Sequence, residues 1–544
     1  MDEEIRRILE EYALQNAVKH KNVPRAGAVI GAVLGSHPEL RSRAHELNGM
    51  IGSVLADVEA LSPGERETRL LALSTELPPL PDAEGGVVMR FAPNPSGPLH
   101  LGHARASILN DAYIHRYGGK YIYRIEDTDP KRVDPDAYQM VREDLEWLGI
   151  EISDIIYQSD RLDIYYEYAR LLIELGGAYV CTCEAERFRE LKIEKKACPC
   201  RTLTPEENLL RYDQMFDGTF IEGQATVRIK TEIDHPDPAI RDYSAMRIVN
   251  STIHPRVDAT VYPLMNFSVA IDDHLLGMTH VIRGKDHIAN TRRQRYIFDY
   301  FGWKPPHYLH YGRMSIEGLV LSTSSMHEGI SKGTYSGWDD IRLGTLRALA
   351  RRGIRPEAVR AAITEIGIGE TDISFSWDNL FAKNRDIIDK ESNRYFFVPE
   401  PISLRVEGGP NQIAEAPRYP GDEERGYRKL HFTGEVLIPA SEMKGGEMIR
   451  LKDLFNITIT GDQSAEYAGD SLADARAAKA PIIQWLPPES AVPCRILTPE
   501  GVLEGFAEAE AADFAGRTIQ FERVGFVRID SVEKNSITAY FTHR

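Results

Sequence analysis

Apolar residues recur mainly at intervals of three and four near the start of the chain. Ile5, Ile8, Leu9, Tyr12 and Leu14 are the first of them, and this spacing is typical of an amphipathic helix. The stretch ends in Leu-Pro-Pro-Leu-Pro at 77–81, where proline cannot continue a helix. We therefore predict an N-terminal helical appendage over residues 1–85.

The pattern then changes to short apolar runs that alternate with helical segments. Val87–Phe91 and Tyr121–Ile125 are predicted strands, with a helix between them that begins at about His100. This alternation predicts a parallel α/β sheet. Residues 181–260 are irregular and contain several Asp-Pro and His-Pro turns, so we interpret them as an insertion before the alternation resumes at Val261.

After Lys390 the chain consists of short runs in which apolar and polar residues alternate. Residues 434–439 (GEVLIP) and 536–541 (SITAYF) are two of these runs, and turn residues separate them. Such a pattern predicts β-sandwich or β-barrel modules. The fold class is therefore α/β followed by all-β, in several domains.

Composition adds bounds to this picture. A chain of 544 residues is too long for one hydrophobic core, and 42% hydrophobic with 27% charged residues is typical of a globular protein. The first 20 residues lack the basic and apolar segments of a secretory signal, and the apolar run 26–35 is too short to cross a bilayer. We expect a cytoplasmic protein without a membrane partner.

Charge and cysteines each point to a local site. The net charge of −17 argues against indiscriminate nucleic-acid binding, yet residues 342–355 contain five arginines and no acid. They are either a phosphate-binding face or a solvated helix face.

Four of the five cysteines form two Cys-x-Cys pairs, which either close a structural Cys₄ zinc site or cluster by chance: Cys181, Cys183, Cys198 and Cys200.

The sharpest motif is residues 90–105, RFAPNPSGPLHLGHAR, in which a Pro/Gly-rich turn delivers two histidines to a helix start. Amide N–H groups and the helix dipole attract phosphate there, and Gly102 permits close approach. His100 and His103 can donate to phosphoryl oxygens as negative charge develops. The alternative is that both histidines only cap and pack the helix.

The full string resembles the HIGH signature of class I aminoacyl-tRNA synthetases, and its flanks match the glutamyl/glutaminyl branch. The resemblance implies ATP with Mg²⁺, and it makes His100 and His103 the catalytic residues that stabilise the transition state at the α-phosphate. Positioning and charge stabilisation suffice, so no protein nucleophile is needed. The implied ATP-binding residues are Pro93, Gly97, His100, Leu101, Gly102, His103, Ser322 and Thr323.

Two further strings concern the amino acid. Residues 124–130, RIEDTDP, resemble the run of glutamyl-tRNA synthetases in which Glu126 contacts the α-amino group, although a solvated turn is the alternative. Within DDHLLGMTHVIRGKDH at 272–287, Arg283 offers a planar fork for a carboxylate, unless it pairs with Asp286 instead. The resemblance implies that glutamate is bound by Arg90, Glu126, Tyr262, Met265 and Arg283. Met265 stands where relatives usually have a tyrosine, so either Tyr262 substitutes for it or the pocket relies more on Arg90 and Arg283.

The lysine-containing KMSKS loop of the family is replaced here by VLSTSS at 320–325. Lys332, Arg313 and His327 are candidate replacements for the missing cation. We interpret the Ser/Thr-rich loop as a trait of archaeal-type glutamyl enzymes rather than as a sign of inactivation.

The resemblance implies ATP-dependent ligation of L-glutamate to tRNA(Glu) through glutamyl-adenylate, and leaves open whether tRNA(Gln) is also charged. A glutaminyl-tRNA synthetase and a non-catalytic tRNA-binding relative are the alternatives. We expect a monomer whose appendage docks other proteins. The implied tRNA-binding residues are Arg342, Arg347, Arg351 and Arg352. The expected segments are the appendage (1–85), the two halves of a Rossmann-type catalytic domain (86–180 and 261–345), an acceptor-end-binding insertion (181–260), a helical connector (346–395) and β-barrel anticodon-binding domains (396–544).

Overall fold

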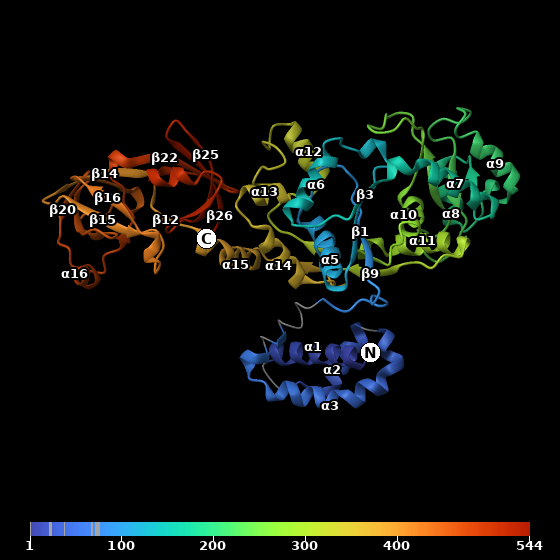
Figure 1. The fold of residues 1–544 in the computed structure, drawn as a ribbon, viewed down its shortest axis with the longest axis horizontal. Coiled ribbons are helices and arrows are strands. Elements are labelled where there is room, and N and C mark those ends of the chain that lie inside the picture. Colours follow the sequence, from blue (N-terminus) through green and yellow to red (C-terminus); the bar gives the residue numbers. More distant parts are fainter. Residues whose placement is uncertain (1, 21–23, 37, 67–68, 71–76) are drawn as a thin grey trace.

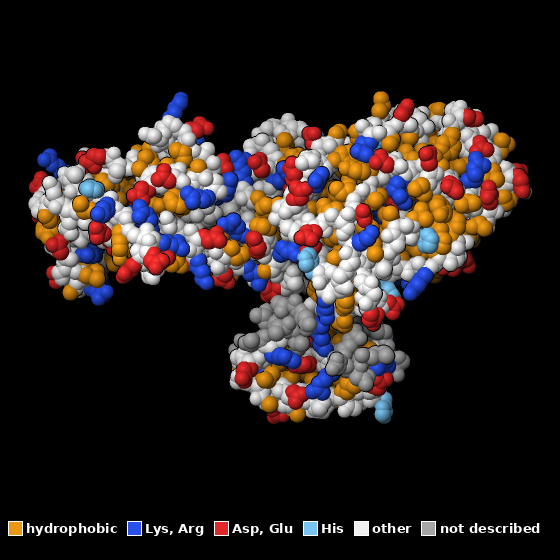
Figure 2. Space-filling view, in the orientation of Figure 1, with side chains coloured by type: hydrophobic (Ala, Val, Ile, Leu, Met, Phe, Trp, Pro, Cys, Tyr) orange, Lys and Arg blue, Asp and Glu red, His pale blue; other side chains and the backbone are white. Residues whose placement is uncertain are grey.

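The computed structural model describes residues 2–20, 24–36, 38–66, 69–70 and 77–544. The molecule is elongated, with β-rich modules at one end, an α/β region in the middle and a mixed insertion at the other end (Figure 1). A small helical bundle lies beside the middle region. Lys and Arg side chains are interspersed with Asp and Glu over the face drawn in Figure 2. None of the described helices is long and apolar enough to cross a membrane.

The N-terminal bundle consists of α1 (Asp2–His20), α2 (Ala26–Ser36) and α3 (Ala44–Ala60). Ile5 and Leu9 of α1 are buried in its core, which confirms the helical spacing in this stretch. Part of the predicted appendage, at 21–23, 37, 67–68 and 71–76, lies outside the described residues.

The connection that follows the bundle is bound to the middle region. The Leu80 N–H donates to the Tyr117 hydroxyl at 3.0 Å, and the Tyr113 hydroxyl donates to the Pro78 carbonyl at 2.9 Å. His280 bonds to the Pro81 carbonyl at 2.7 Å. The proline-rich run is therefore a tether that lies along the central α/β region.

The central sheet is parallel, as the alternation predicts. The Thr279 N–H donates to the Val88 carbonyl at 3.0 Å, which joins a three-stranded part to a two-stranded part. β1 of the three-stranded part contacts β8 of the two-stranded part, so the strands lie in the order β3, β2, β1, β8, β9. Their bounds are β1 (Val87–Phe91), β2 (Gly119–Ile125), β3 (Asp154–Tyr157), β8 (His280–Gly284) and β9 (His307–Tyr311). The helices here are α5 (Leu101–Tyr117), α6 (Ala137–Trp147), α7 (Leu162–Glu174), α10 (Met265–Leu275) and α11 (Ile288–Phe301).

The insertion is more regular than its sequence suggests. It contains an antiparallel sheet of β4 (Ala178–Cys181), β5 (Thr226–Ile229), β6 (Tyr243–Ile248) and β7 (Val261–Pro263), with α8 (Ala185–Ile193) and α9 (Pro205–Asp213). Every residue of β4 and β7 is buried. Neither strand therefore shows the alternation that reveals a strand in sequence.

A helical connector links the central α/β region to the β modules. It contains α12 (Thr323–Ser331), α13 (Leu346–Arg351), α14 (Pro356–Ile366) and α15 (Trp377–Ile388), with the short strands β10 (Met314–Ser315) and β11 (Ile373–Ser374). The N-terminal end of α13 lies at the candidate site, and its C-terminal end contacts the β region.

The β region confirms the prediction of β modules, and there are two of them in the described chain. The chain passes from the inner module to the outer one and returns. The inner module is a seven-stranded sheet of β12 (Arg394–Tyr395), β13 (Phe397–Pro399), β22 (Ala491–Thr498), β23 (Gly501–Glu508), β24 (Thr518–Phe521), β25 (Gly525–Glu533) and β26 (Ser536–His543). The outer module contains β14 (Pro401–Glu407), β15 (Gln412–Pro417), β16 (Tyr427–Phe432), β17 (Glu435–Pro439), β18 (Met448–Leu451), β19 (Asn456–Gly461), β20 (Ser464–Tyr467), α16 (Leu472–Ala477) and β21 (Ile482–Ile483).

A buried ion network joins these two modules. Arg428, 1% exposed, pairs with Glu508 and, at 3.2 Å, with Glu522. Removing one member of a buried network leaves an uncompensated charge, which typically costs about 3–5 kcal/mol. We expect Arg428→Met to lower the free energy of unfolding of the β region by that amount in urea titration. A double Arg428→Met, Glu508→Met variant should lose less, and an equal loss would contradict this reasoning.

Burial raises the pKa of Glu508 to about 7, although Arg428 acts in the opposite direction. A carboxyl that binds its proton more tightly when folded stabilises the fold at low pH, and this contribution disappears as pH rises through about 7. The unfolding midpoint should therefore fall between about pH 5 and pH 8. Glu508→Gln should flatten that dependence, measured by thermal denaturation.

Candidate active site

The two motif histidines lie together at the start of α5, directly after β1. His100 caps the helix, and its Nδ1 accepts the Gly102 N–H at 3.0 Å. Its proton is therefore on Nε2, which is free to donate. The rings of His100 and His103 stack with centroids 3.7 Å apart.

Both histidines are neutral at ordinary pH. Burial lowers the pKa of His100 to about 4 and, together with the nearby His100, that of His103 to about 3. The Nδ1 of His103 is buried without a hydrogen-bond partner among the described residues. The pair is thus a set of neutral imidazoles with unused hydrogen-bonding capacity, which suits a phosphate ligand better than packing alone does.

The Ser/Thr-rich loop lies against the same turn. A Cβ built at Gly97 would come within 2.7 Å of the Thr323 methyl and 3.2 Å of the Trp338 ring, so only glycine permits this approach. Ser322 caps α12 through a bond from the Ser325 N–H. The structure therefore brings Thr323, which the resemblance assigns to the ATP site, to the histidine turn, and Ser322 is its neighbour in the chain.

The remaining ATP-site candidates contribute mainly backbone. The Pro93 carbonyl accepts the Glu126 N–H at 3.0 Å, which ties the end of β1 to the end of β2. Leu101 is fully buried, and its N–H donates to the Gly344 carbonyl at 3.2 Å. Of the three candidate cations, Lys332 is at the far end of α12, where it pairs with Glu328.

Arg283 is a buried cation at the end of β8. It is 8% exposed, and it donates to the Thr291 hydroxyl at 2.5 Å and the Gln294 side-chain oxygen at 3.0 Å. Its Nε is buried without a partner, and within the described ranges no carboxylate pairs with it. Asp286, the alternative partner, contacts His287 instead.

No carboxylate is bonded to this charge within the described chain. Burial, together with the nearby Arg90, lowers the pKa of Arg283 to about 10, although the nearby Asp273 and Glu126 act in the opposite direction. Since burial of an unpaired charge is unfavourable, a carboxylate that entered this position would relieve the imbalance. Both neutral partners, Thr291 and Gln294, are suited to hold the guanidinium without neutralising it.

Beside Arg283, the ends of β1 and β2 carry a second group of charges. Arg90 and Arg124 both donate to Asp273 Oδ1, at 3.2 and 2.7 Å, and Arg124 also donates to Glu126 at 3.1 Å. Burial raises the pKa of Glu126, while both arginines oppose this effect. The site therefore has adjacent cationic and anionic positions, as an amino acid with two carboxylates and one ammonium requires.

Comparisons with known proteins give the family of the chain. The family model of tRNA synthetases class I (E and Q), catalytic domain, matches residues 86–390, and anti-codon binding domains of the same class match residues 392–473 and 482–530. The chain is 64% identical to a glutamate–tRNA ligase of Methanocorpusculum labreanum and 63% identical to that of Methanoculleus marisnigri, with 100% of each chain covered. The chain belongs to the class I glutamyl/glutaminyl-tRNA synthetases. These archaeal relatives place the synthetase in the glutamate branch.

A solved structure is also similar in part. The crystal structure of a glutamate tRNA ligase from Elizabethkingia meningosepticum in complex with its amino acid aligns at 22% identity and a TM-score of 0.41. The alignment covers 56% of this chain and 70% of that chain.

The two remaining glutamate candidates of the synthetase differ in position. Tyr262 is fully buried in β7, and its hydroxyl donates to the Ala259 carbonyl at 2.9 Å. Tyr262 therefore does not supply the hydroxyl that Met265 lacks, which corrects the expectation for Tyr262. Met265 begins α10, next to Asn266, which accepts a hydrogen bond from Gln294 at 3.3 Å. It borders the layer that supports Arg283.

Sequence reasoning missed that supporting layer. Thr291 and Gln294 are three residues apart on α11 and so share a helix face. Thr291 also bonds to His310 at 2.9 Å. The Tyr308 ring lies 4.8 Å from the Arg283 guanidinium carbon, and its hydroxyl is buried without a partner among the described side chains. The helix spacing was the only signal in the sequence that could have revealed them.

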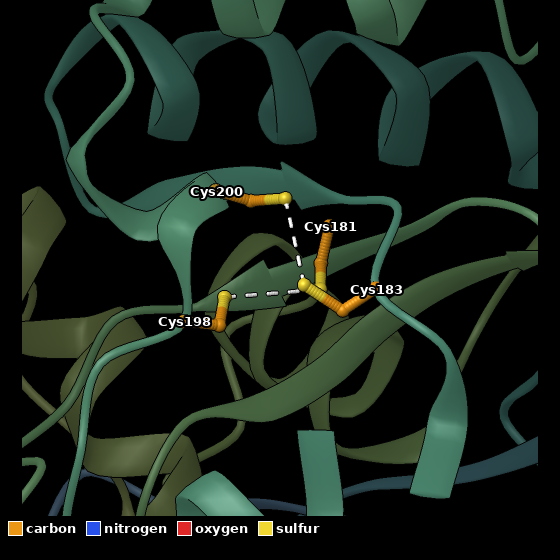
Figure 3. A group of neighbouring side chains, drawn as sticks. All are labelled: Cys181, Cys183, Cys198 and Cys200. Carbon is orange, nitrogen blue, oxygen red and sulfur yellow. Dashed lines mark hydrogen bonds between the residues drawn. The ribbon is translucent and has the colours of Figure 1, made fainter. Parts of the chain in front are cut away.

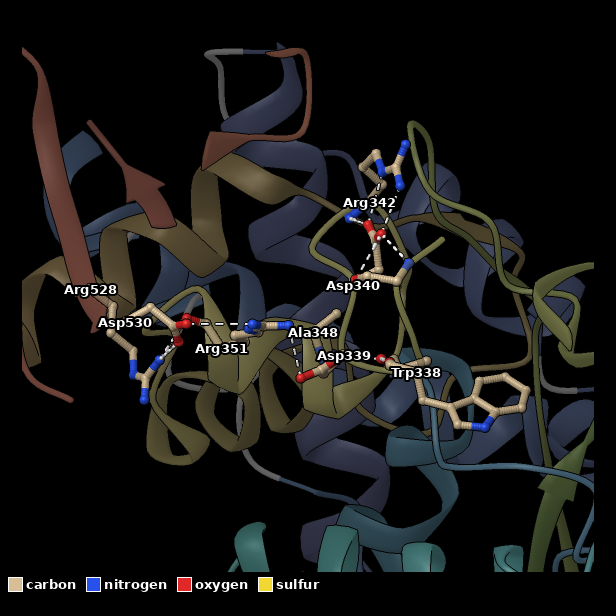
Figure 4. A network of polar contacts seen from close by, with 10 residues as sticks. Trp338, Asp339, Asp340, Arg342, Ala348, Arg351, Arg528 and Asp530 are labelled. Carbon is tan, nitrogen blue, oxygen red and sulfur yellow. Dashed lines mark hydrogen bonds and ion pairs between the residues drawn. The ribbon is translucent and has the colours of Figure 1, made fainter. Parts of the chain in front are cut away.

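The four arginines expected to bind tRNA are all bonded within the synthetase. Arg342 bonds to Asp340, and Arg347 to Glu143 and Asp144. Arg351 bridges Asp339 at 3.0 Å and Asp530 of the inner β module at 3.4 Å (Figure 4).

Arg352 lies in the joint between the connector and the inner β module. It is 6% exposed, and it donates to the Phe541 and Thr542 carbonyls at 3.3 and 2.9 Å. A guanidinium enclosed in this way is not open to a phosphate, so the expectation for Arg352 is corrected. The basic segment contributes to domain packing. This role could not be predicted from the sequence, because the partners of its arginines lie far away in the chain.

The four clustered cysteines converge in the insertion (Figure 3). Their Sγ atoms all lie within 4.8 Å of one another, with 3.9 Å between Cys181 and Cys198 and 3.8 Å between Cys183 and Cys200. A tetrahedral zinc site with Zn–S bonds of about 2.3 Å has sulfur–sulfur edges of about 3.8 Å. Arg211 donates to Cys200 Sγ at 3.4 Å, which favours a thiolate. The donor set and its spacing therefore fit zinc.

Proposed function

We propose that the synthetase joins L-glutamate to tRNA(Glu) in two steps at the expense of ATP, with Mg²⁺ accompanying the nucleotide. In the first step a glutamate α-carboxylate oxygen attacks the α-phosphorus of ATP, and pyrophosphate leaves. In the second, a ribose hydroxyl of the terminal adenosine attacks the acyl carbon, and AMP leaves. The buried Arg283, with no carboxylate partner in the described chain, is the observation that carries the choice of glutamate.

Each residue has a role in this proposal. Arg283 binds the side-chain carboxylate, since its fork offers two donors to two oxygens. Glu126 accepts from the α-ammonium, and Arg90 orients the α-carboxylate toward phosphorus. His100 and His103 donate to phosphoryl oxygens as charge develops. Pro93, Gly97, Leu101, Gly102, Ser322 and Thr323 form the surrounding surface for ATP, mainly through backbone.

The test is tRNA-dependent ATP–pyrophosphate exchange with glutamate or glutamine as the amino acid. We expect exchange with glutamate. Exchange with glutamine alone would overturn the proposal in favour of a glutaminyl enzyme, and no exchange with either would favour a non-catalytic tRNA-binding protein. Charging of purified tRNA(Glu) and tRNA(Gln) then determines whether the enzyme discriminates between them.

We also propose that Cys181, Cys183, Cys198 and Cys200 hold one structural Zn²⁺, which cross-links β4 to the turn at 198–200. Four sulfur ligands leave no open position for chemistry. We expect about one zinc per chain by metal analysis, its loss in Cys183→Ser, and a lower unfolding midpoint in that variant. Cys494→Ala is the control, because Cys494 lies outside the cluster; equal metal in all three proteins would refute the site.

Several finer expectations complete the proposal. Arg342, with a side chain 45% exposed, remains a candidate for tRNA phosphate contact. We infer that the enzyme is cytoplasmic and monomeric, and light scattering can test the monomeric state. We also infer that the N-terminal bundle docks partner proteins. Pull-down with and without residues 1–76 tests the docking, and identical partners in both samples would contradict it.

A further inference from the structure

Both backbone polar groups of Leu99, the residue before His100, are hydrogen-bonded. The Leu99 N–H donates to Asp144 Oδ2 at 2.7 Å, and the Leu99 carbonyl accepts the Leu346 N–H at 2.9 Å. The next contact along the turn comes from the segment before α13, where His100 and Thr345 form an isolated antiparallel β-bridge. Of these contacts, only the one from Asp144 comes from a side chain.

Asp144 occupies an unexpected position on α6. Val141, Leu145 and Leu148 form the apolar face of this helix, and Asp144 lies among them at 3% exposure. Burial raises its pKa to about 7, although Arg347 lowers it through an ion pair at 3.1 Å. Since apolar residues pack such a face without desolvating a charge, packing alone does not account for this carboxylate.

The consequence concerns the geometry of the histidines. His100 is the N-cap of α5 and His103 is on its first turn, so the position of the Leu99 peptide determines where both rings lie. A displacement of about 1 Å in a catalytic group reduces rates by about 10²-fold. A strong acceptor on the Leu99 N–H therefore has direct value for the reaction.

We propose that Asp144, held by Arg347, is a positioning residue for adenylate formation, which fixes the Leu99 peptide and through it His100 and His103. It touches neither ATP nor glutamate. The inference rests on the proposed function, because it assigns the histidines to that reaction.

The test replaces Asp144 with leucine, which suits the apolar face but accepts no hydrogen bond. Arg347 keeps its ion pair with Glu143, and its side chain is 27% exposed, so the substitution leaves no unpaired buried charge. We expect an unfolding midpoint near that of the wild type, a kcat for pyrophosphate exchange lower by about 10²-fold, and a KM for glutamate within about threefold of the wild type. Asp144→Asn retains an acceptor oxygen for the Leu99 N–H and should recover most of kcat.

Asp111 provides a matched control. It is as buried as Asp144 and pairs with Arg360 at 2.5 Å, also within the catalytic domain, but it does not contact the turn. Asp111→Leu should leave kcat within about threefold of the wild type. Wild-type kcat in Asp144→Leu, equal losses in Asp144→Leu and Asp144→Asn, or an equal loss in Asp111→Leu would each overturn the inference.

Two further outcomes are separable. If Asp144→Leu does not fold, Arg347→Met removes the group that holds the carboxylate, and an unchanged kcat in that variant would overturn the inference. If the wild-type enzyme shows no exchange with glutamate, the proposed function fails instead. Normal exchange in the wild type with no effect of Asp144 variants refutes the positioning role alone.

Discussion

Replacing Arg283 with alanine is expected to lower kcat/KM for glutamate by about 30- to 4,000-fold in pyrophosphate exchange. Truncating one member of a buried charge pair typically costs about 2–5 kcal/mol, and the bound substrate carboxylate would be left without its partner. The loss should appear mainly in KM, because the side-chain carboxylate is bound similarly before and during the reaction.

Two comparisons sharpen this result. Arg283→Lys keeps the charge but loses the planar fork and should recover only part of the activity. Arg161→Ala also removes a cation from a buried carboxylate, Asp272, but Arg161 is not in the proposed substrate set. Unchanged glutamate kinetics in Arg283→Ala would show that another residue binds the carboxylate, whereas equal effects in Arg161→Ala would indicate general damage.

His103→Ala is expected to reduce kcat for exchange by about 10²- to 10³-fold, because a preorganised donor to the developing phosphoryl charge is removed. KM for glutamate should change little. His115, an exposed histidine on the same helix, is the control, and His115→Ala should retain the wild-type rate. A similar kcat in both variants would contradict the catalytic role.

The same histidines predict a pH dependence. Their pKa values are lowered to about 4 and about 3, so both stay neutral as pH falls below the ordinary histidine value of about 6.5. Their protonation should therefore not reduce exchange between about pH 8 and pH 5.5. A decline in kcat with a midpoint near pH 6.5 that disappears in His103→Ala would show a normal pKa and contradict the predicted neutrality.

Sequence patterns predicted those parts of the fold that local chemistry determines. Val87–Phe91 forms the predicted strand, and the next begins two residues before its predicted start, because each combines an apolar run with turn residues at its ends. The alternating runs after Lys390 form β modules for the same reason. The insertion sheet was missed because its fully buried strands have no alternation.

In the candidate site, too, the sequence predicted only the features that depend on local chemistry. Arg283 and the two histidines could be assigned from motifs, since a cation at a strand end and imidazoles at a helix start carry their chemistry locally. The arginine-rich segment could not be interpreted in this way. Its partners are far away in the chain, such as Asp530 for Arg351 and Thr542 for Arg352.

By itself, the sequence determined the family, the parallel sheet and the β modules, because these depend on motifs and periodicities within short stretches. Only the tertiary structure decided that Arg283 has no carboxylate partner among the described residues, that Tyr262 is engaged elsewhere, and that Asp144 reaches the Leu99 peptide. The physical reason is that burial and hydrogen-bond pairing depend on contacts between distant segments, which periodicity within a segment does not specify.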